Sequence, residues 1–156
     1  MNAMIQEDAV HMLLRLGMTV SCAESCTGGL VAKRITDVPG SSGVFLGGVV
    51  SYANRVKSGL LGIPDEMLRT EGAVSESCAA LMSKGIRSLM HTDIGLGTTG
   101  YAGPDGDPVG LVYIAYSDEL HTVVRRLLLE GDRRCIRAQT ADAVLSLMME
   151  ELKWRL

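Results

Sequence analysis

The fold of this chain is decided by the stretch Met18-Thr19-Val20-Ser21-Cys22-Ala23-Glu24-Ser25-Cys26-Thr27-Gly28-Gly29-Leu30-Val31. Residues 18–23 form a short apolar run that is typical of a buried strand. Thr27 then predicts the N-cap of a helix, with two glycines in its first turn and with Leu30 and Ile35 facing inward. A buried strand that leads through a glycine turn into a helix is the repeating unit of an α/β sheet.

Helix and strand patterns alternate on the C-terminal side of this stretch, and a further helix precedes it. Apolar periodicity and capping residues predict helices at residues 4–16, 54–61, 64–72, 75–91 and 132–154. Asn54 and Asp132 are the predicted caps of two of them. Strands are predicted at 44–52, 93–98, 109–116 and 121–129, the last two as an antiparallel pair. The alternation predicts a three-layer α/β/α sandwich with a mostly parallel, mixed sheet of about five strands.

Length and composition predict one globular domain over residues 1–156. Of the 156 residues, 47% are apolar and 21% are charged, which is enough for a proper core and excludes a disordered chain. The net charge of −3 argues against binding of a nucleic acid polymer, which needs a basic face. A single small-molecule nucleotide needs only a few backbone amides and one cation.

The sequence contains no targeting or membrane signal. Glu7, Asp8 and His11 lie where a secretory signal would have its apolar core, and no run approaches the roughly 18 apolar residues of a membrane span. Four cysteines in such a chain are read as reduced thiols, and the expected compartment is the cytoplasm. The many Met and Leu residues are compatible with a homodimer formed through helices.

Three glycine-rich or polar segments follow predicted strands, at residues 25–29, 52–57 and 98–106. Ligands of open α/β sheets bind at this edge. In the first segment, Gly28 and Gly29 let backbone N–H groups approach an anion, and Ser25 would stand beside those donors. The alternative is that Ser25 and Thr27 only cap the helix. The segment is not a P-loop, because no Gly-Lys-Ser/Thr follows.

The second segment offers a base for Ser25. Lys57 lies about one helical turn beyond Asn54, and Tyr52 ends the preceding apolar strand. A serine hydroxyl is a poor nucleophile until a base takes its proton, and a buried lysine with a lowered pKa can do so. The alternative is that Lys57 is a solvated surface residue.

Other nucleophiles and bases fit less well. His11, His91 and His121 lie away from the glycine-rich loops, which argues against a Ser-His-Asp triad and favours a Ser/Lys pair. Cys26 follows Ser25, so its side chain diverges from the site, and we interpret it as a packing residue. Cys22 and Cys26 have no second ligand pair, so no metal site is predicted.

Six ordered blocks then identify a family. They are 23–29 (Ala-Glu-Ser-Cys-Thr-Gly-Gly), 36–42 (Thr-Asp-Val-Pro-Gly-Ser-Ser), 48–52 (Gly-Val-Val-Ser-Tyr) with Asn54 and Lys57, 72–75 (Gly-Ala-Val-Ser), 99–104 (Thr-Gly-Tyr-Ala-Gly-Pro) and 131–133 (Gly-Asp-Arg) with Arg137. In these blocks the chain closely resembles the CinA C-terminal domain family, the nicotinamide-nucleotide amidases, over nearly its whole length.

The resemblance implies hydrolysis of nicotinamide mononucleotide to nicotinate mononucleotide and ammonia, without a metal or an organic cofactor. It implies Ser25 as nucleophile, Lys57 as base and Tyr52 as a group that orients or relays the proton. Ser42, a second serine in a family block, stays open as part of the relay or as the nucleophile itself.

The resemblance also implies substrate contacts. The oxyanion would be held by the amides of Gly28 and Gly29 or by those of Thr99 and Gly100, and Arg137 would hold the 5′-phosphate. The expected substrate-binding residues are Thr27, Gly28, Gly29, Ser42, Asn54, Thr99, Gly100 and Arg137.

The chain departs from the family pattern in three places. It has no N-terminal nucleotide-pyrophosphatase domain, so we expect the stand-alone type. Residues 105–108 replace a longer glycine-rich loop, and Tyr101 stands where a smaller aliphatic residue is usual. These departures keep two alternatives open: a nucleotide-binding or regulatory module without turnover, and an amidase for another small amide.

Overall fold

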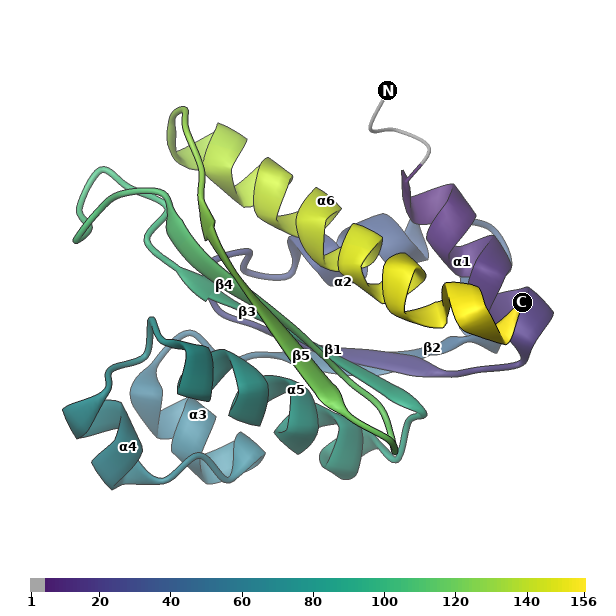
Figure 1. The fold of residues 1–156 in the computed structure, drawn as a ribbon, viewed down its shortest axis with the longest axis horizontal. Coiled ribbons are helices and arrows are strands. Elements are labelled where there is room, and N and C mark those ends of the chain that lie inside the picture. The colour runs from purple at the N-terminus through teal and green to yellow at the C-terminus, as the bar shows by residue number, and fades with distance from the viewer. Residues whose placement is uncertain (1–4) are drawn as a thin grey trace.

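The computed structural model describes residues 5–156, in which a five-stranded sheet lies between two layers of helices (Figure 1). The strand order is β2-β1-β3-β4-β5. The strands are β1 (Val20–Glu24), β2 (Phe45–Val50), β3 (Ile94–Gly100), β4 (Leu111–Ser117) and β5 (Thr122–Leu128). β1 is parallel to both β2 and β3, whereas β4 is antiparallel to β3 and β5. The predicted α/β class with a mixed sheet of five strands is confirmed.

Each face of the sheet is covered by its own group of helices (Figure 1). One face carries α1 (Ile5–Leu16), α2 (Leu30–Thr36) and α6 (Arg133–Leu152), and the other carries α3 (Asn54–Leu61), α4 (Asp65–Thr70) and α5 (Glu76–Met90). Two 3₁₀ turns, η2 (Ser41–Gly43) and η3 (Lys153–Arg155), complete the elements. The predicted start of the first helix at residue 4 lies outside the described residues. Within residues 5–156, no helix combines the length and the apolar character that crossing a bilayer requires.

The two faces differ in how closely the helices pack. α1, α2 and α6 bury a large apolar cluster that includes Leu13 and Leu145, with Ile114 of β4 beneath it. On the other face, α5 lies almost against the backbone of β3. A Cβ added to Gly95 would lie 2.0 Å from the carbonyl oxygen of Ser83. Glycine in β3 therefore allows the close approach of α5.

The helix caps follow the sequence prediction in part. Ser75 Oγ accepts from the N–H of Cys78 at 3.1 Å, and Asp132 Oδ1 accepts from the N–H of Cys135 at 2.8 Å. The predicted cap at Asp132 is confirmed, and Ser75, predicted only as the start of its helix, is a second cap. The predicted cap at Asn54 is wrong by one residue, because α3 already includes Asn54 and its N-cap is residue 53, whose side chain makes no capping bond.

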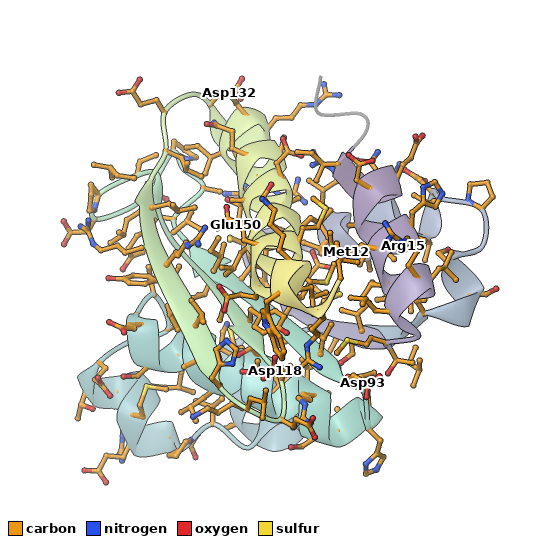
Figure 2. The ribbon with its side chains drawn as sticks, turned by 45° about the vertical axis from the view of Figure 1, so that its right-hand side comes forward. Met12, Arg15, Asp93, Asp118, Asp132 and Glu150 are labelled. Atoms are coloured by element: carbon orange, nitrogen blue, oxygen red, sulfur yellow. The ribbon has the colours of Figure 1, made fainter. Side chains whose placement is uncertain are left out.

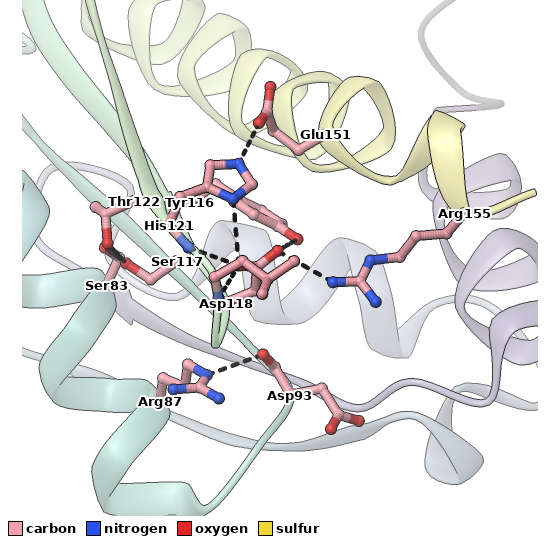
Figure 3. A network of polar contacts seen from close by, with 11 residues as sticks. Ser83, Arg87, Asp93, Tyr116, Ser117, Asp118, His121, Thr122, Glu151 and Arg155 are labelled. Carbon is pink, nitrogen blue, oxygen red and sulfur yellow. Dashed lines mark hydrogen bonds and ion pairs between the residues drawn. The ribbon is translucent and has the colours of Figure 1, made fainter.

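A polar network around Asp118 closes the end of the sheet where β1 and β3 begin (Figure 3). Tyr116 Oη donates to Asp118 Oδ2 at 2.7 Å, and Arg155 Nη2 lies 3.5 Å from the same oxygen. His121 lies 3.4 Å from Asp118 through Nδ1 and 2.7 Å from Glu151 through Nε2. The network joins the β4–β5 turn to α6 and to the C-terminal residues.

Candidate active site

The candidate site lies where β1, β2 and β3 end. Ser25 follows β1 directly, Tyr52 follows β2, and Gly100 ends β3, so parallel strands bring these residues to one edge. A cavity of about 300 Å³ opens there. Its lining residues are Ser25, Cys26, Tyr52, Gly100, Tyr101, Ala102, Gly103, Pro104, Asp105 and Arg133.

Lys57 lies beside Ser25. It belongs to the first turn of α3, yet its side chain points into the molecule and is only 1% exposed. Its Nζ donates to Ser25 Oγ at 3.1 Å and to the backbone carbonyl of Tyr52 at 2.9 Å. Because Ser25 also lines the cavity, its hydroxyl lies between a buried amine and the space open to a ligand.

The surroundings of Lys57 favour the neutral amine. None of the ion pairs among residues 5–156 includes Lys57, and the titratable groups that influence its pKa are the thiols of Cys78 and Cys26. Burial lowers the pKa of Lys57, since the charged form loses its hydration. Burial also raises the pKa of Cys26 to about 12 and that of Cys78 to about 11. Both thiols therefore stay protonated at neutral pH and supply no counter-charge.

The turn after Ser25 depends on its two glycines. Gly28 has φ +58° and Gly29 has φ +105°, a region that residues with a Cβ rarely adopt. Thr27 Oγ1 lies 2.7 Å from Thr98 Oγ1 and is fully buried, so it is not the cap of α2. The prediction of Thr27 as N-cap is wrong, because the glycines delay the start of the helix to Leu30.

Glu24 caps α2 instead. Its two carboxylate oxygens accept from the N–H groups of Val31 at 2.8 Å and Ala32 at 3.0 Å, and the residue is only 2% exposed. A carboxylate at a helix N-terminus is favoured by both the free N–H groups and the helix dipole. The last residue of β1 thus fixes the far end of the turn that carries Ser25.

Two arginines of α6 reach this edge of the sheet in different ways. Arg137, predicted as the phosphate-binding cation, donates to the carbonyls of Cys26 at 3.1 Å and Thr27 at 2.9 Å, and it does not line the cavity. Arg133 does line it. Arg133 donates to the carbonyl of Gly103 at 2.5 Å and to Tyr52 Oη at 3.1 Å.

Tyr52 contacts Lys57 only through the backbone carbonyl of Tyr52. The carbonyl accepts from Lys57 Nζ, whereas the phenol is exposed and contacts Arg133. A proton relay through the phenol, which the family resemblance implies, has no direct contact to support it. In this structure the phenol forms part of the cavity wall.

Of the other predicted site residues, two lie at or beneath the cavity and two lie away from it. Gly100 lines the cavity, and Thr99 is buried beneath it with Oγ1 donating to the carbonyl of Ala73 at 2.7 Å. Asn54 is exposed and lies outside the cavity lining. Ser42 lies in η2, before β2 begins, and therefore at the opposite end of the strand from Tyr52. The structure does not bring Ser42 to Lys57.

Sequence reasoning missed Glu24 and Arg133 as contributors to the site. Glu24 is a carboxylate in an otherwise apolar strand just before a helix, which is a signal for a cap. Arg133 precedes Arg137 by four residues, so both lie on one face of α6. Sequence alone does not tell which of the two faces the cavity.

A second cavity, of about 350 Å³, lies at the opposite end of the sheet beside the Asp118 network. Figure 2 shows Asp93 and Asp118 at that end and Asp132, which caps α6, at the other. No serine, cysteine, lysine or histidine lines this second cavity. Within the described part of the chain, no group of three His, Cys, Asp or Glu side chains is placed to hold a metal ion. Of these two cavities, only the one beside Ser25 is lined by nucleophilic side chains.

The family model of the CinA C-terminal domain matches residues 2–152. The chain belongs to the CinA C-terminal domain family. The family suggested by the six sequence blocks is thereby confirmed. A relative from Desulforudis audaxviator is 52% identical over 141 residues, which cover 88% of this chain and 34% of that protein. A CinA-like protein from Dictyoglomus turgidum is 44% identical over 152 residues, covering 95% of this chain and 37% of the relative. The chain thus spans about a third of the length of these relatives.

Solved structures of the family agree over the whole fold. The competence/damage inducible protein CihA from Agrobacterium tumefaciens aligns with a TM-score of 0.92 at 34% identity, covering 96% of this chain and 94% of that one. The competence damage-inducible protein A from Klebsiella pneumoniae aligns with a TM-score of 0.95 at 30% identity, covering 97% of each chain.

Proposed function

We propose that this chain is an amidohydrolase that cleaves the carboxamide of nicotinamide mononucleotide to give nicotinate mononucleotide and ammonia. The observation that carries the proposal is the 3.1 Å contact between Lys57 Nζ and Ser25 Oγ at the edge of a cavity. Burial of Lys57 without a carboxylate partner favours the neutral amine that a base requires. The choice of substrate rests on the family resemblance.

In the proposed reaction, neutral Lys57 takes the proton from Ser25 Oγ as that oxygen attacks the carboxamide carbon. The tetrahedral intermediate collapses when the Lys57 ammonium returns the proton to the amide nitrogen, which leaves as ammonia. A water molecule then attacks the acyl-enzyme and gives a proton to Lys57. The ester bond to Ser25 breaks, Ser25 recovers a proton from Lys57, and the product acid loses its remaining proton to solvent and is released as the carboxylate.

The turn after Ser25 supplies donors for the oxyanion. The N–H of Gly28 already donates to the carbonyl of Ser25 at 3.1 Å, so it is not free for this role. The N–H groups of Cys26, Thr27 and Gly29 have no acceptor within residues 5–156. Of these three residues only Cys26 lines the cavity, and we assign the role to its N–H. Thr99 and Gly100, the alternative donors, belong to the ladder between β3 and β4.

Arg133 is the cation best placed for the 5′-phosphate, because it lines the cavity and Arg137 does not. The mechanism needs no metal or organic cofactor, because the base and the nucleophile are both side chains. All four cysteines are free thiols, and we place the reaction in the cytoplasm, where thiols stay reduced.

Ammonia release from nicotinamide mononucleotide tests the proposal. Ser25→Ala and Lys57→Met each remove one member of the pair, and we expect each to lower kcat/KM by roughly 10³-fold or more. Methionine keeps most of the lysine volume in the core. Ser88→Ala and Lys84→Met change exposed residues of α5 and serve as matched controls with unchanged turnover.

Near-full activity of either site variant, with the fold intact by circular dichroism, would reject the Ser/Lys assignment. Two further measurements distinguish the alternatives: calorimetry tests for a regulatory module, and activity assays with other amides test for a different amidase. Binding of the mononucleotide by the unmodified chain without ammonia release would favour a regulatory module. Turnover of other small amides, but not of the mononucleotide, would favour a different amidase.

A further inference from the structure

The outer edge of β2 has no partner strand. β2 is the first strand in the order β2-β1-β3-β4-β5, so β1 binds only its inner edge. On that inner edge, the N–H of Ser51 donates to the carbonyl of Glu24. Because backbone groups alternate in direction along a strand, the N–H and C=O groups of Gly48 and Val50 point outward. Within residues 5–156 no second strand binds them.

The two edges of the sheet differ in their protection against a further strand. The other edge strand, β5, carries Arg125 and Arg126 in its middle, and charged side chains discourage pairing. β2 has the sequence Phe-Leu-Gly-Gly-Val-Val, with neither a charge nor a proline. Its register with β1 shifts once, between Phe45 and Gly47, and is regular over residues 47–50. β2 is therefore the edge that is open to another strand.

The exposed residues along this edge have a two-fold pattern centred on Val49. Leu46, Val50 and Tyr52 are each at least half exposed, and Gly48 is exposed as well. In an antiparallel pair with its two-fold axis at Val49, Gly48 of each copy lies opposite Val50 of the other, and their outward N–H and C=O groups bond to each other. Leu46 of each copy then lies opposite Tyr52 of the other.

Both facing pairs combine side chains that fit each other. Gly48 has no side chain and leaves room for Val50, while the apolar side chain of Leu46 can pack on the ring of Tyr52. A second copy of the chain supplies both pairs twice, once on each side of the axis. A strand of unrelated sequence has no such match. The two-fold pattern therefore points to this same chain as the occupant of the edge.

The pairing also reaches the candidate active site. Tyr52 follows β2 at the Ser25 end of the sheet, where it lines the cavity and its phenol accepts from Arg133. Leu46 of the same chain lies near the other end of β2, about 20 Å away along the strand. A second copy that runs antiparallel brings its own Leu46 to this wall of the cavity.

We propose that two copies of this chain pair through β2 in antiparallel register about Val49, and that Leu46 of each copy covers Tyr52 at the cavity of the other. The dimer is formed through strands, whereas the composition was compatible with a dimer formed through helices. The covered phenol is held at the cavity wall, so turnover depends on the dimer. This last consequence rests on the proposed amidase function, but the pairing itself does not.

Disulfide trapping tests the register without any activity. In a Cys135→Ser background, which removes the exposed native thiol, a Leu46→Cys chain is mixed with a Tyr52→Cys chain and oxidised. Facing residues have Cβ atoms about 4.5–5.5 Å apart, so we expect a covalent dimer from this mixture. Each chain alone should give none, because the two copies of one position lie about 20 Å apart. Leu128→Cys, exposed on β5, is the matched control and should not cross-link to Tyr52→Cys.

Analytical ultracentrifugation and ammonia release test the dimer and its role. Leu46→Lys places a charge against Tyr52 of the other copy, and we expect it to weaken the dimer by about tenfold or more and to lower kcat/KM with it. Leu128→Lys, on the other edge of the sheet, should change neither quantity. Thermal melting shows whether each variant folds, and Val50→Lys provides a second disruption of the same edge.

A monomeric unmodified chain, the absence of a cross-link in the mixture, or a dimer that persists in both Leu46→Lys and Val50→Lys overturns the inference. If the cross-link forms but Leu46→Lys monomers keep full turnover, the pairing stands and its role at the cavity is rejected. If the unmodified chain is a dimer that releases no ammonia, the amidase function is rejected and the pairing stands.

Discussion

At the scale of single residues, the burial of Lys57 destabilises its charged form and thereby favours the neutral amine that can act as a base. An ammonium removed from water without a carboxylate partner is destabilised, which lowers the pKa of Lys57 from its ordinary value of 10.5. Between the lowered pKa and 10.5, the unfolded chain binds the proton that the folded chain has lost, so stability rises with pH over that range. The same shift provides a neutral amine next to Ser25.

The pH dependence of turnover follows from this shift. If Lys57 is the base, kcat/KM rises with pH as Lys57 loses its proton, and the midpoint lies below 10.5 because burial lowers that pKa. Initial rates of ammonia release between about pH 6 and about pH 10 measure the profile. Activity that falls as the pH rises through this range would exclude Lys57 as the base. Lys57→Arg should be inactive over the whole range, since arginine stays protonated.

At the scale of elements, the turn between β1 and α2 is held by residues that do not line the cavity. Glu24 binds the first free N–H groups of α2, Thr98 pairs with Thr27, and Arg137 binds two carbonyls of the turn. The Glu24 carboxylate accepts from N–H groups of α2 and does not pair with Lys57. This arrangement fixes Ser25 without giving the amine a counter-ion.

Removal of the Glu24 carboxylate measures what this cap contributes. Glu24→Ala leaves two buried N–H groups without an acceptor, and we expect a loss of about 1–3 kcal/mol in the free energy of unfolding. Urea unfolding followed by circular dichroism gives the value. Glu76→Ala, at an exposed position in the first turn of α5, should change stability by less than about 0.5 kcal/mol. Equal stability of Glu24→Ala and the unmodified chain would show that the cap is dispensable.

At the scale of the whole molecule, the two ends of the sheet carry different sets of side chains. The end with Ser25 carries a cavity and nucleophilic groups, whereas the Asp118 end joins a hairpin, a helix and the C-terminal turn (Figure 3). Burial alone would raise the pKa of Asp118. Hydrogen bonds from Tyr116 Oη and from backbone N–H groups outweigh burial, and the pKa is lowered from its ordinary value of 3.8.

The contribution of Asp118 to stability is therefore present above pH 3.8 and is lost as the pH falls through its lowered pKa. Tyr116→Phe removes the strongest of these hydrogen bonds, and we expect a loss of about 1–2 kcal/mol at neutral pH that shrinks in acid. Urea unfolding at neutral pH and near pH 3 provides the comparison. Tyr113→Phe, on the same strand, is the control. A penalty that grows in acid would contradict this account.

The sequence by itself determined the class of the fold, the order of the elements and one helix cap. Periodicity and capping act between residues a few positions apart, so the cap at Asp132 is predictable without coordinates. It also indicated Ser25 and Lys57, because residues that follow parallel strands meet at one edge.

Only the tertiary structure decided which side chains face the cavity. It placed Arg133 at the cavity and Arg137 behind the turn, gave the cap of α2 to Glu24 rather than Thr27, and left Ser42 at the wrong end of β2. The physical reason is that these outcomes depend on which side chains point toward residues that are far away in the sequence. Arg137 and Thr27 are 110 residues apart in the sequence, and no local sequence pattern predicts how α6 crosses the sheet.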